Sequence, residues 1–170
     1  MITVALDLGQ IGPALRRLEQ AALNLRPVYA DIGQELVNTT RRRFETSEAP
    51  DGSKWEPNSP VTLARLVGPS MRKKDGTLNK RGEARIAGKR PLIGETRLLS
   101  TEIHDVVTAT GVQVGSNKVQ AAMMHFGGKR SEFPHLWGDI PARPFVGVSR
   151  EDEREILALT LDHLKRATRP

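Results

Sequence analysis

The chain has 170 residues, a length that suits one domain with its own core, and its 38% hydrophobic content, 11 prolines and 15 glycines predict long irregular segments. It contains no cysteine, which excludes disulfides, thiolate metal sites and a cysteine nucleophile, and its apolar runs are far shorter than the roughly 20 residues that cross a bilayer. The net charge is +6, and residues 61–98 hold 10 Lys/Arg against 3 Asp/Glu, so the basicity is local and suits either nucleic acid or an acidic protein surface.

The first 48 residues predict a strand followed by two helices. Apolar residues alternate over 2–8, the pattern of a half-buried strand. Apolar residues then recur at helical spacing over 11–25, with Pro13 in the first turn, until Arg26-Pro27 ends the helix. A second helix is expected from about 28 to 48, with the arginine triplet 41–43 as a solvated helix end.

A turn-rich loop and a basic segment come next. Trp55 lies among prolines and Asp51-Gly52, and we expect it to form a lid on the core. Residues 68–90 carry four glycines and eight cations without a sustained apolar period, which predicts an extended, mobile basic insertion. Its cations are the candidate partner-binding residues: Arg72, Lys73, Lys74, Lys80, Arg81, Arg85, Lys89 and Arg90.

The remaining chain predicts a hairpin, a short helix, an edge strand and a long helix. A turn at Thr110-Gly111 joins strands over 98–108 and 111–115, and Gly127-Gly128 stops a short helix that begins near 121. A strand over 144–148 precedes a helix that Ser149 caps. We therefore expect one α+β domain spanning 1–170, in which two N-terminal helices and one C-terminal helix pack on an antiparallel sheet of strands 2–8, 98–108, 111–115 and 144–148.

Residue patterns for catalysis or metal binding are weak. His125, His135 and Asp139 lack the helical spacing of metal ligands, and we expect His125 to bond a backbone carbonyl instead. On a strand, the hydroxyl, imidazole and carboxylate within 100–105 are too far apart for a triad. Residues 127–129 lack the spacing of a P-loop. We expect a protein that is not an enzyme and that uses neither a metal nor a cofactor.

Four of the seven aromatic residues fall between Phe126 and Phe145, among glycines, prolines and basic residues. Such a composition suits an anchoring surface, and the candidate oligomer-interface residues are Phe133, Trp137, Arg143 and Phe145. We expect Trp137 and Arg143 to be its most exposed members. An irregular loop held to the core by its rings is an equal alternative for Phe126 and Phe145.

The same stretch carries a family resemblance. The sequence AAMMHFGG, followed by FPHLWGDIPARPFVGVS, resembles the virion morphogenesis, or tail completion, proteins of Mu-like tailed phages. Segments 43–62 and 91–103 resemble two further blocks of that family, except that Glu95-Thr96-Arg97 replaces an expected Thr-Gly turn. The resemblance spans most of residues 1–166.

The resemblance implies a structural protein, made in the host bacterial cytoplasm, that completes the tail or joins it to the head. It also implies a place in the virion at the head–tail junction and a homo-oligomeric ring, for which six copies would match tail symmetry. The implied partners are head-connector and tail-tube or terminator proteins, with no role for a membrane.

The basic insertion fits two kinds of partner. Docking on an acidic phage protein is favoured, because the insertion has no aromatic residue for base stacking and no recognition-helix pattern. Non-specific contact with DNA in the channel stays open. The alternative functions are a tail terminator that caps the tail tube and a sequence-independent DNA-binding packaging accessory protein.

Overall fold

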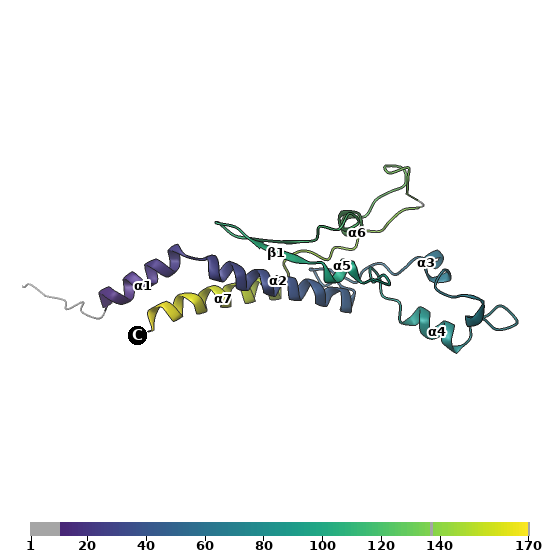
Figure 1. Ribbon diagram of the computed structural model, residues 1–170, viewed down its shortest axis with the longest axis horizontal. Helices are drawn as coiled ribbons and strands as arrows, with labels where there is room; N and C mark the ends of the chain where they lie inside the picture. Colours follow the sequence, from purple (N-terminus) through teal and green to yellow (C-terminus); the bar gives the residue numbers. More distant parts are fainter. Residues whose placement is uncertain (1–10, 137, 170) are drawn as a thin grey trace, which may run out of the picture.

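The protein is elongated, with helices along its length and a small sheet on one side. The computed structural model describes residues 11–136 and 138–169. Helix α1, Ile11–Leu23, lies at one end and helix α4, Lys80–Ala87, at the other (Figure 1). Between them run α2, Arg26–Thr46, and α7, Arg150–Thr168, and α7 packs against both α1 and α2. The expected strand over 2–8 lies outside the described residues.

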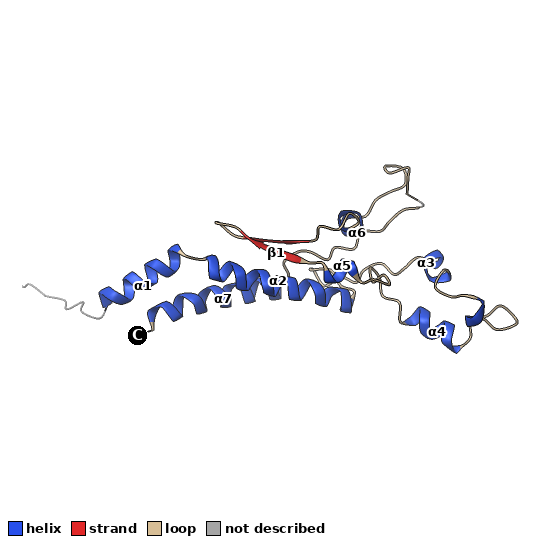
Figure 2. Ribbon diagram, in the orientation of Figure 1, coloured by secondary structure: helices blue, strands red, loops and turns tan. Residues whose placement is uncertain are grey.

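The short elements sit above and beyond α2. They are α3 (Pro60–Ala64), the 3-10 helix η1 (Pro69–Met71), α5 (Leu98–Thr101), strand β1 (His104–Val107), strand β2 (Val112–Gly115) and α6 (Ala121–Phe126). Figure 2 shows the strands lying over α2, and both strands contact that helix. The structure combines helices with a two-stranded antiparallel sheet that packs on α2, so the expected α+β class is confirmed.

The long helices begin and end where local residues allow it. Pro27 stands in the first turn of α2, where its missing N–H costs no hydrogen bond, and Ser47 ends the helix at a φ of 56°. Ser149 caps α7: its hydroxyl accepts from the Asp152 amide at 3.1 Å, and its own amide donates to the Asp152 carboxylate at 2.7 Å. The two expected N-terminal helices and the capped C-terminal helix are confirmed.

The hairpin is shorter than its sequence suggests. Strands β1 and β2 pair antiparallel, from His104 opposite Gly115 to Val107 opposite Val112. The chain before β1 is not a strand but the short helix α5. Leu99 and Ile103, both buried, stand four residues apart, a spacing that puts two side chains on one face of either a strand or a helix. The apolar pattern therefore could not distinguish the two.

Close packing of the hairpin on α2 requires Gly33. A Cβ atom there would lie 2.7 Å from the Asp105 carboxylate and 2.8 Å from a methyl group of Val112. Any side chain at this position would push the strands away from the helix. A glycine near the middle of α2 lowers helix propensity, and the close approach of the hairpin explains its presence.

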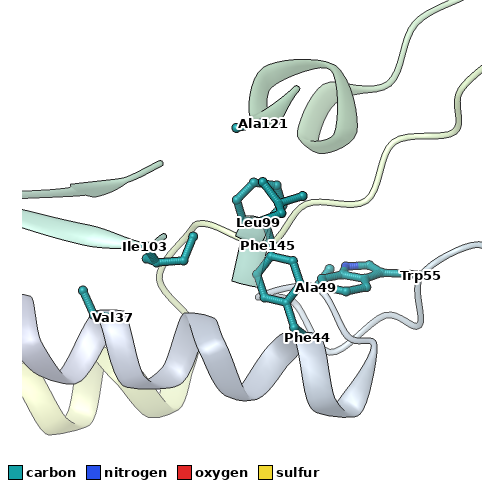
Figure 3. Packing of buried hydrophobic residues seen from close by; sticks show 8 residues of the cluster. All are labelled: Val37, Phe44, Ala49, Trp55, Leu99, Ile103, Ala121 and Phe145. Atoms are coloured by element: carbon teal, nitrogen blue, oxygen red, sulfur yellow. The ribbon is translucent and has the colours of Figure 1, made fainter. Parts of the chain in front are cut away.

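The core is one cluster of buried apolar side chains between α2, α5, α6 and the loops beside them (Figure 3). Phe44 stacks edge-on with Trp55 at a centroid distance of 5.4 Å and lies 5.2 Å from Phe145. The Trp55 indole donates to the Pro144 carbonyl at 2.8 Å. Trp55 is 6% exposed, so its expected place over the core is confirmed. The remaining members of the cluster are Val37, Ala49, Leu99, Ile103 and Ala121.

Arg43 joins α2 to α7 inside the protein. Its guanidinium donates to the carbonyls of Phe145 (3.1 Å) and Gly147 (2.8 Å) and to the Asp152 carboxylate (2.6 Å). Only Arg41 and Arg42 of the triplet are exposed, so the expectation of a fully solvated helix end is wrong for Arg43. A carboxylate and two carbonyls in a buried position offset the cost of removing this cation from water.

The same contact explains why residues 144–148, all of them described, form no strand. Arg43 occupies the carbonyls of Phe145 and Gly147, which a neighbouring strand would otherwise use. Just before this segment in the chain, Ile140 forms a single antiparallel bridge with Gly128, which is too short to count as a strand. Among the described residues the sheet therefore has two strands and not the expected four.

Burial would raise the pKa of Asp152, but its hydrogen bonds from Ser149 and the charge of Arg43 outweigh that effect and hold the pKa below 3.8. Burial lowers the pKa of Arg43, and Asp152 opposes this change. Both groups are charged at neutral pH, so the contact is an ion pair.

We predict that Asp152→Ala lowers the free energy of unfolding by about 3–5 kcal/mol, because it leaves a buried cation without its counterion. The matched control is Asp162→Ala, which removes the exposed ion pair with Arg166 and should cost no more than about 0.5 kcal/mol. Urea denaturation at neutral pH measures both. Equal losses in the two variants would contradict the role assigned to the Arg43 pair.

The depressed pKa of Asp152 also predicts a pH dependence. A carboxyl group whose folded pKa lies below its unfolded value stabilises the protein above the unfolded pKa, and that contribution disappears as pH falls through the folded pKa. The stability difference between the wild type and Asp152→Asn should therefore be constant above about pH 5 and shrink below about pH 4. Urea midpoints measured at a series of pH values test this, and a difference that grows on acidification would refute it.

Candidate partner-binding surface

The basic insertion is ordered by polar contacts of its own. Asp75 accepts from the amide (2.9 Å) and hydroxyl (2.6 Å) of Thr77, which closes a tight turn. Asn79 then caps α4 by accepting from the amides of Arg81 and Gly82. The expectation of an extended segment is wrong, because η1 and α4 occupy much of it.

Helix α4 rests on η1 through a glycine. A Cβ on Gly82 would lie 2.6 Å from the Met71 carbonyl oxygen, so only a glycine allows the two backbones to approach this closely. Leu78, Gly82 and Ile86 follow one another at intervals of four residues and form the inner face of this unit. The four-residue spacing of these side chains and the Asn79 cap are the pattern that predicts α4 from the sequence. The four glycines of the segment favour a loop instead and conceal this pattern. We call residues 68–90 the basic arm.

Nearly all of the charged side chains of the basic arm are exposed to solvent. Seven of its eight cations are exposed, while Lys89 is half-buried and donates to the Ile93 carbonyl. Only Asp75 and Glu83 oppose them, so the arm alone has a charge of +6. Hydrogen bonds from Thr77 lower the pKa of Asp75, which is therefore ionised at neutral pH. All of the candidate partner-binding residues except Lys89 are therefore accessible to solvent, and Arg90 lies at the base of the arm.

A second basic feature lies at the base of the arm. Arg90 lines a hollow of about 410 Å³ together with Arg41 and Arg97. Arg41 is held in place because its guanidinium donates to the carbonyls of Thr101 and Ile103. Sequence reasoning missed Arg41 and Arg97 as neighbours of the arm, because residues 41, 90 and 97 come together only in the folded chain.

The candidate oligomer-interface residues do not form one exposed surface. Phe145 is 1% exposed and belongs to the core, and Arg143, 7% exposed, donates to the carbonyls of Glu56 and Pro57 at 2.8 Å. Phe133 is 37% exposed, whereas Trp137 lies outside the described residues. The expected exposure of Arg143 is wrong, because loop carbonyls bind its guanidinium inside the protein.

Phe126 is the exposed aromatic residue that the sequence did not single out for contact. It ends α6 and is 76% exposed, although its neighbour His125 stacks edge-on with it at 4.5 Å. The alternative in which Phe126 anchors the loop to the core is therefore wrong. The sequence feature that indicates this exposure is the position of Phe126 directly before Gly127, where the chain leaves the helix and turns.

His125 has a structural position. Its Nδ1 accepts from the Phe145 amide at 3.3 Å, so its partner is a backbone donor and not the expected carbonyl. Burial lowers its pKa, and the ring is neutral at pH 7. Within the described ranges, no three His, Asp or Glu side chains gather as a metal site. In the same part of the chain, no helix is long and apolar enough to span a bilayer.

The described part of the chain is thus an elongated α+β fold with a projecting basic arm and a buried aromatic core. The chain belongs to the phage virion morphogenesis family, whose sequence profile matches residues 6–165. It is similar to tail completion protein S of Escherichia phage P2, with 24% identity over 155 residues that cover 83% of this chain and 85% of the phage P2 protein. No solved structure matches it significantly.

These comparisons confirm the family resemblance seen in the sequence. The similar protein comes from phage P2, so the resemblance is not confined to Mu-like phages. Membership in this family makes the chain a structural protein of phage assembly and a component of the virion.

We predict that the basic arm is dispensable for folding. Among the regular elements α4 contacts chiefly η1, so replacing residues 69–88 by a short Gly-Ser linker should change the melting temperature by no more than about 2 °C. Trp55→Ala, which opens a cavity in the core, should lower it by about 6 °C or more. Scanning calorimetry measures both variants. Unfolding of the linker variant at room temperature would show that the arm is part of the core fold.

Proposed function

We propose that this protein completes the phage tail and joins it to the head, as a non-enzymatic component of a ring in the neck. The observation that carries the proposal is the basic arm, which projects seven exposed cations at one end of the molecule (Figure 1). The similar phage P2 protein is named as a tail completion protein, which supports a role in the last steps of tail assembly.

The partner proposed for the basic arm is an acidic surface on another phage protein. The arm has no aromatic residue on which a base could stack, and Glu83 lies in the same helix as its cations. Its turn and its helix cap are fixed by internal hydrogen bonds, so little conformational entropy is lost when it docks. Charge complementarity of this kind sets the orientation and the rate of association.

The ring is proposed from symmetry. Components placed around the axis of a tail form closed rings, and six copies would match the tail. Phe126 and Phe133, both exposed in this chain, are the aromatic residues available for contacts between neighbouring copies. Arg143 and Phe145 are buried and are not available for such contacts.

We predict that reversing Arg72, Lys73 and Lys74 to Glu blocks head–tail joining, while heads are filled with DNA and tails reach normal length. The control reverses three exposed cations outside the arm, Arg26, Arg42 and Lys54, and should assemble normally. Complementation of a phage that lacks the gene, followed by electron microscopy of the particles, provides the measurement. Overlong tails in the arm variant would instead favour a tail terminator.

The same variants distinguish protein docking from DNA binding. Phosphate contacts weaken steeply with salt, at a log–log slope of about −0.9 per contact, and do not depend on sequence. We expect the purified wild type to bind short duplex DNA only weakly at about 0.15 M salt. Tight binding that the arm variant loses, together with empty heads, would support a DNA-packaging accessory protein instead.

A further inference from the structure

The hollow at the base of the basic arm brings together three arginines from distant parts of the chain. Arg41 comes from α2, Arg90 follows α4, and Arg97 directly precedes α5. All three side chains are exposed to solvent, and none forms an ion pair within the described part of the chain. We call this feature, which these three residues line, the arginine hollow.

Carboxylates of this chain do not neutralise the arginine hollow. Glu45 is the acidic residue of its lining, so three positive charges face one negative charge. Glu102, which follows α5, pairs instead with Lys118 at 3.6 Å, and Glu95 is not part of the lining. A hollow with an excess of one charge concentrates the field of that charge, so this one attracts an anion.

The guanidinium of Arg41 is already held in place. Its Nη2 group donates to the carbonyls of Thr101 (3.1 Å) and Ile103 (3.2 Å). A guanidinium carries N–H donors on all three nitrogens, and the Nη1 and Nε groups of Arg41 make no hydrogen bond to the described residues. These donors are therefore available to a ligand, and little side-chain entropy is lost when they bind it.

Arg97 places a side chain where a glycine would suit the backbone better. Its φ is 55° and its ψ is 10°, in the left-handed region that is unfavourable for any residue with a Cβ atom. The described residues accept no hydrogen bond from its guanidinium, and only its carbonyl takes part, as the acceptor for Ser100 and Thr101. Backbone strain that the fold does not use points to a contact with another molecule.

The polar groups of the lining favour a peptide over a nucleic acid. Glu45 supplies a carboxylate acceptor, and the Ser100 hydroxyl, which donates to the Arg97 carbonyl at 2.8 Å, can still accept through its oxygen. A peptide brings amide N–H donors for these acceptors together with carboxylates for the arginines. A phosphate backbone brings acceptors alone and offers Glu45 no partner.

The size and the apolar part of the lining agree with a peptide. The hollow measures about 410 Å³, within the range of about 300–1,000 Å³ that is typical of ligand sites. Phe44 and Ile93 contribute to its wall, so an apolar side chain has a surface on which to pack. The hollow is therefore suited to a short segment that combines carboxylates with an apolar residue.

We propose that the arginine hollow binds a carboxylate-bearing peptide segment of the protein on which the basic arm docks. Arg41, Arg90 and Arg97 hold the carboxylates, and an apolar side chain of the segment lies against Ile93. This proposal deepens the docking function proposed above and rests on it for the identity of the partner. The exposed cations of the arm accelerate the encounter, and the hollow fixes its register.

Fluorescence anisotropy with a labelled synthetic peptide tests the site in the full chain. The probe has about eight residues, with glutamates on both sides of one leucine and with blocked termini, and the comparison peptide carries glutamine at every glutamate. At about 0.15 M salt we expect the acidic probe to bind at least about ten-fold more tightly than the glutamine peptide.

Matched variants separate the hollow from general charge. The hollow variant, Arg90→Gln with Arg97→Gly, should bind the probe at least about ten-fold more weakly than the wild type. The control, Arg26→Gln with Arg42→Gln and Ser47→Gly, removes as many charges and relieves another left-handed residue, with a φ of 56°, outside the lining. It should bind within about two-fold of the wild type.

Arg97→Gly alone distinguishes binding from folding. Glycine adopts a φ of 55° without strain, so the melting temperature should change by no more than about 2 °C although the probe binds more weakly. A melting temperature that falls by much more would make Arg97 a structural residue and overturn its assignment to the site.

A variant of the arm separates this site from the function of the arm. Lys73 and Lys74 lie outside the lining, so Lys73→Gln with Lys74→Gln should bind the probe within about two-fold of the wild type. If reversing the cations of the arm leaves head–tail joining intact while the probe still requires Arg90 and Arg97, the docking function is wrong and the peptide site stands.

Three results would overturn the peptide site itself. The first is an acidic probe that does not bind at concentrations up to about 1 mM. The second is an equal loss of affinity in the hollow variant and its control, which would reduce the binding to general charge. The third is short duplex DNA that binds more tightly than the probe and is lost in the hollow variant, which would assign the hollow to nucleic acid.

Discussion

The buried guanidinium of Arg43 is the contact on which the rest of the structure depends. It lies in α2, receives its counterion from Asp152 in α7, and binds the carbonyls of Phe145 and Gly147. A charge in this position is tolerated only if every donor finds a partner. Among the described residues, no buried side-chain nitrogen or oxygen lacks one. Two helices and an irregular segment are thereby fixed to one another at a single point.

This junction determines how the segment with the strongest family resemblance is used. Because Arg43 holds the backbone at 145–147, Phe145 is placed against Phe44, and Trp55 closes the cluster from the other side. Arg143 is a second buried guanidinium that joins distant segments, because it donates to the loop carbonyls of Glu56 and Pro57. The aromatic-rich segment is therefore largely structural, and of its described aromatic residues Phe126 and Phe133 remain exposed.

The two ends are suited to different kinds of contact. The basic arm is ordered by local hydrogen bonds and by the close approach of Gly82 to Met71, so it can display cations without taking part in the core. Helices α1 and α7 present exposed apolar side chains instead. Electrostatic docking governs rate and orientation, whereas apolar contact supplies binding energy that does not depend on salt.

The sequence by itself determined the long helices, the Ser149 cap, the turn of the hairpin and the family, because each rests on residues close together in the chain or on their order. The sequence also located the basic arm, but the glycines of the arm led to the prediction of an extended segment where α4 forms. Leu99 and Ile103 suit a strand as well as a helix, so the sequence placed β1 too early. Only the tertiary structure decided that Arg43 and Arg143 are buried and that Phe126 is exposed. The partners of both arginines stand 86 to 109 positions away along the chain. No local pattern records such a pairing, because the free energy of a charged side chain depends on which carbonyls and carboxylates the fold brings to it.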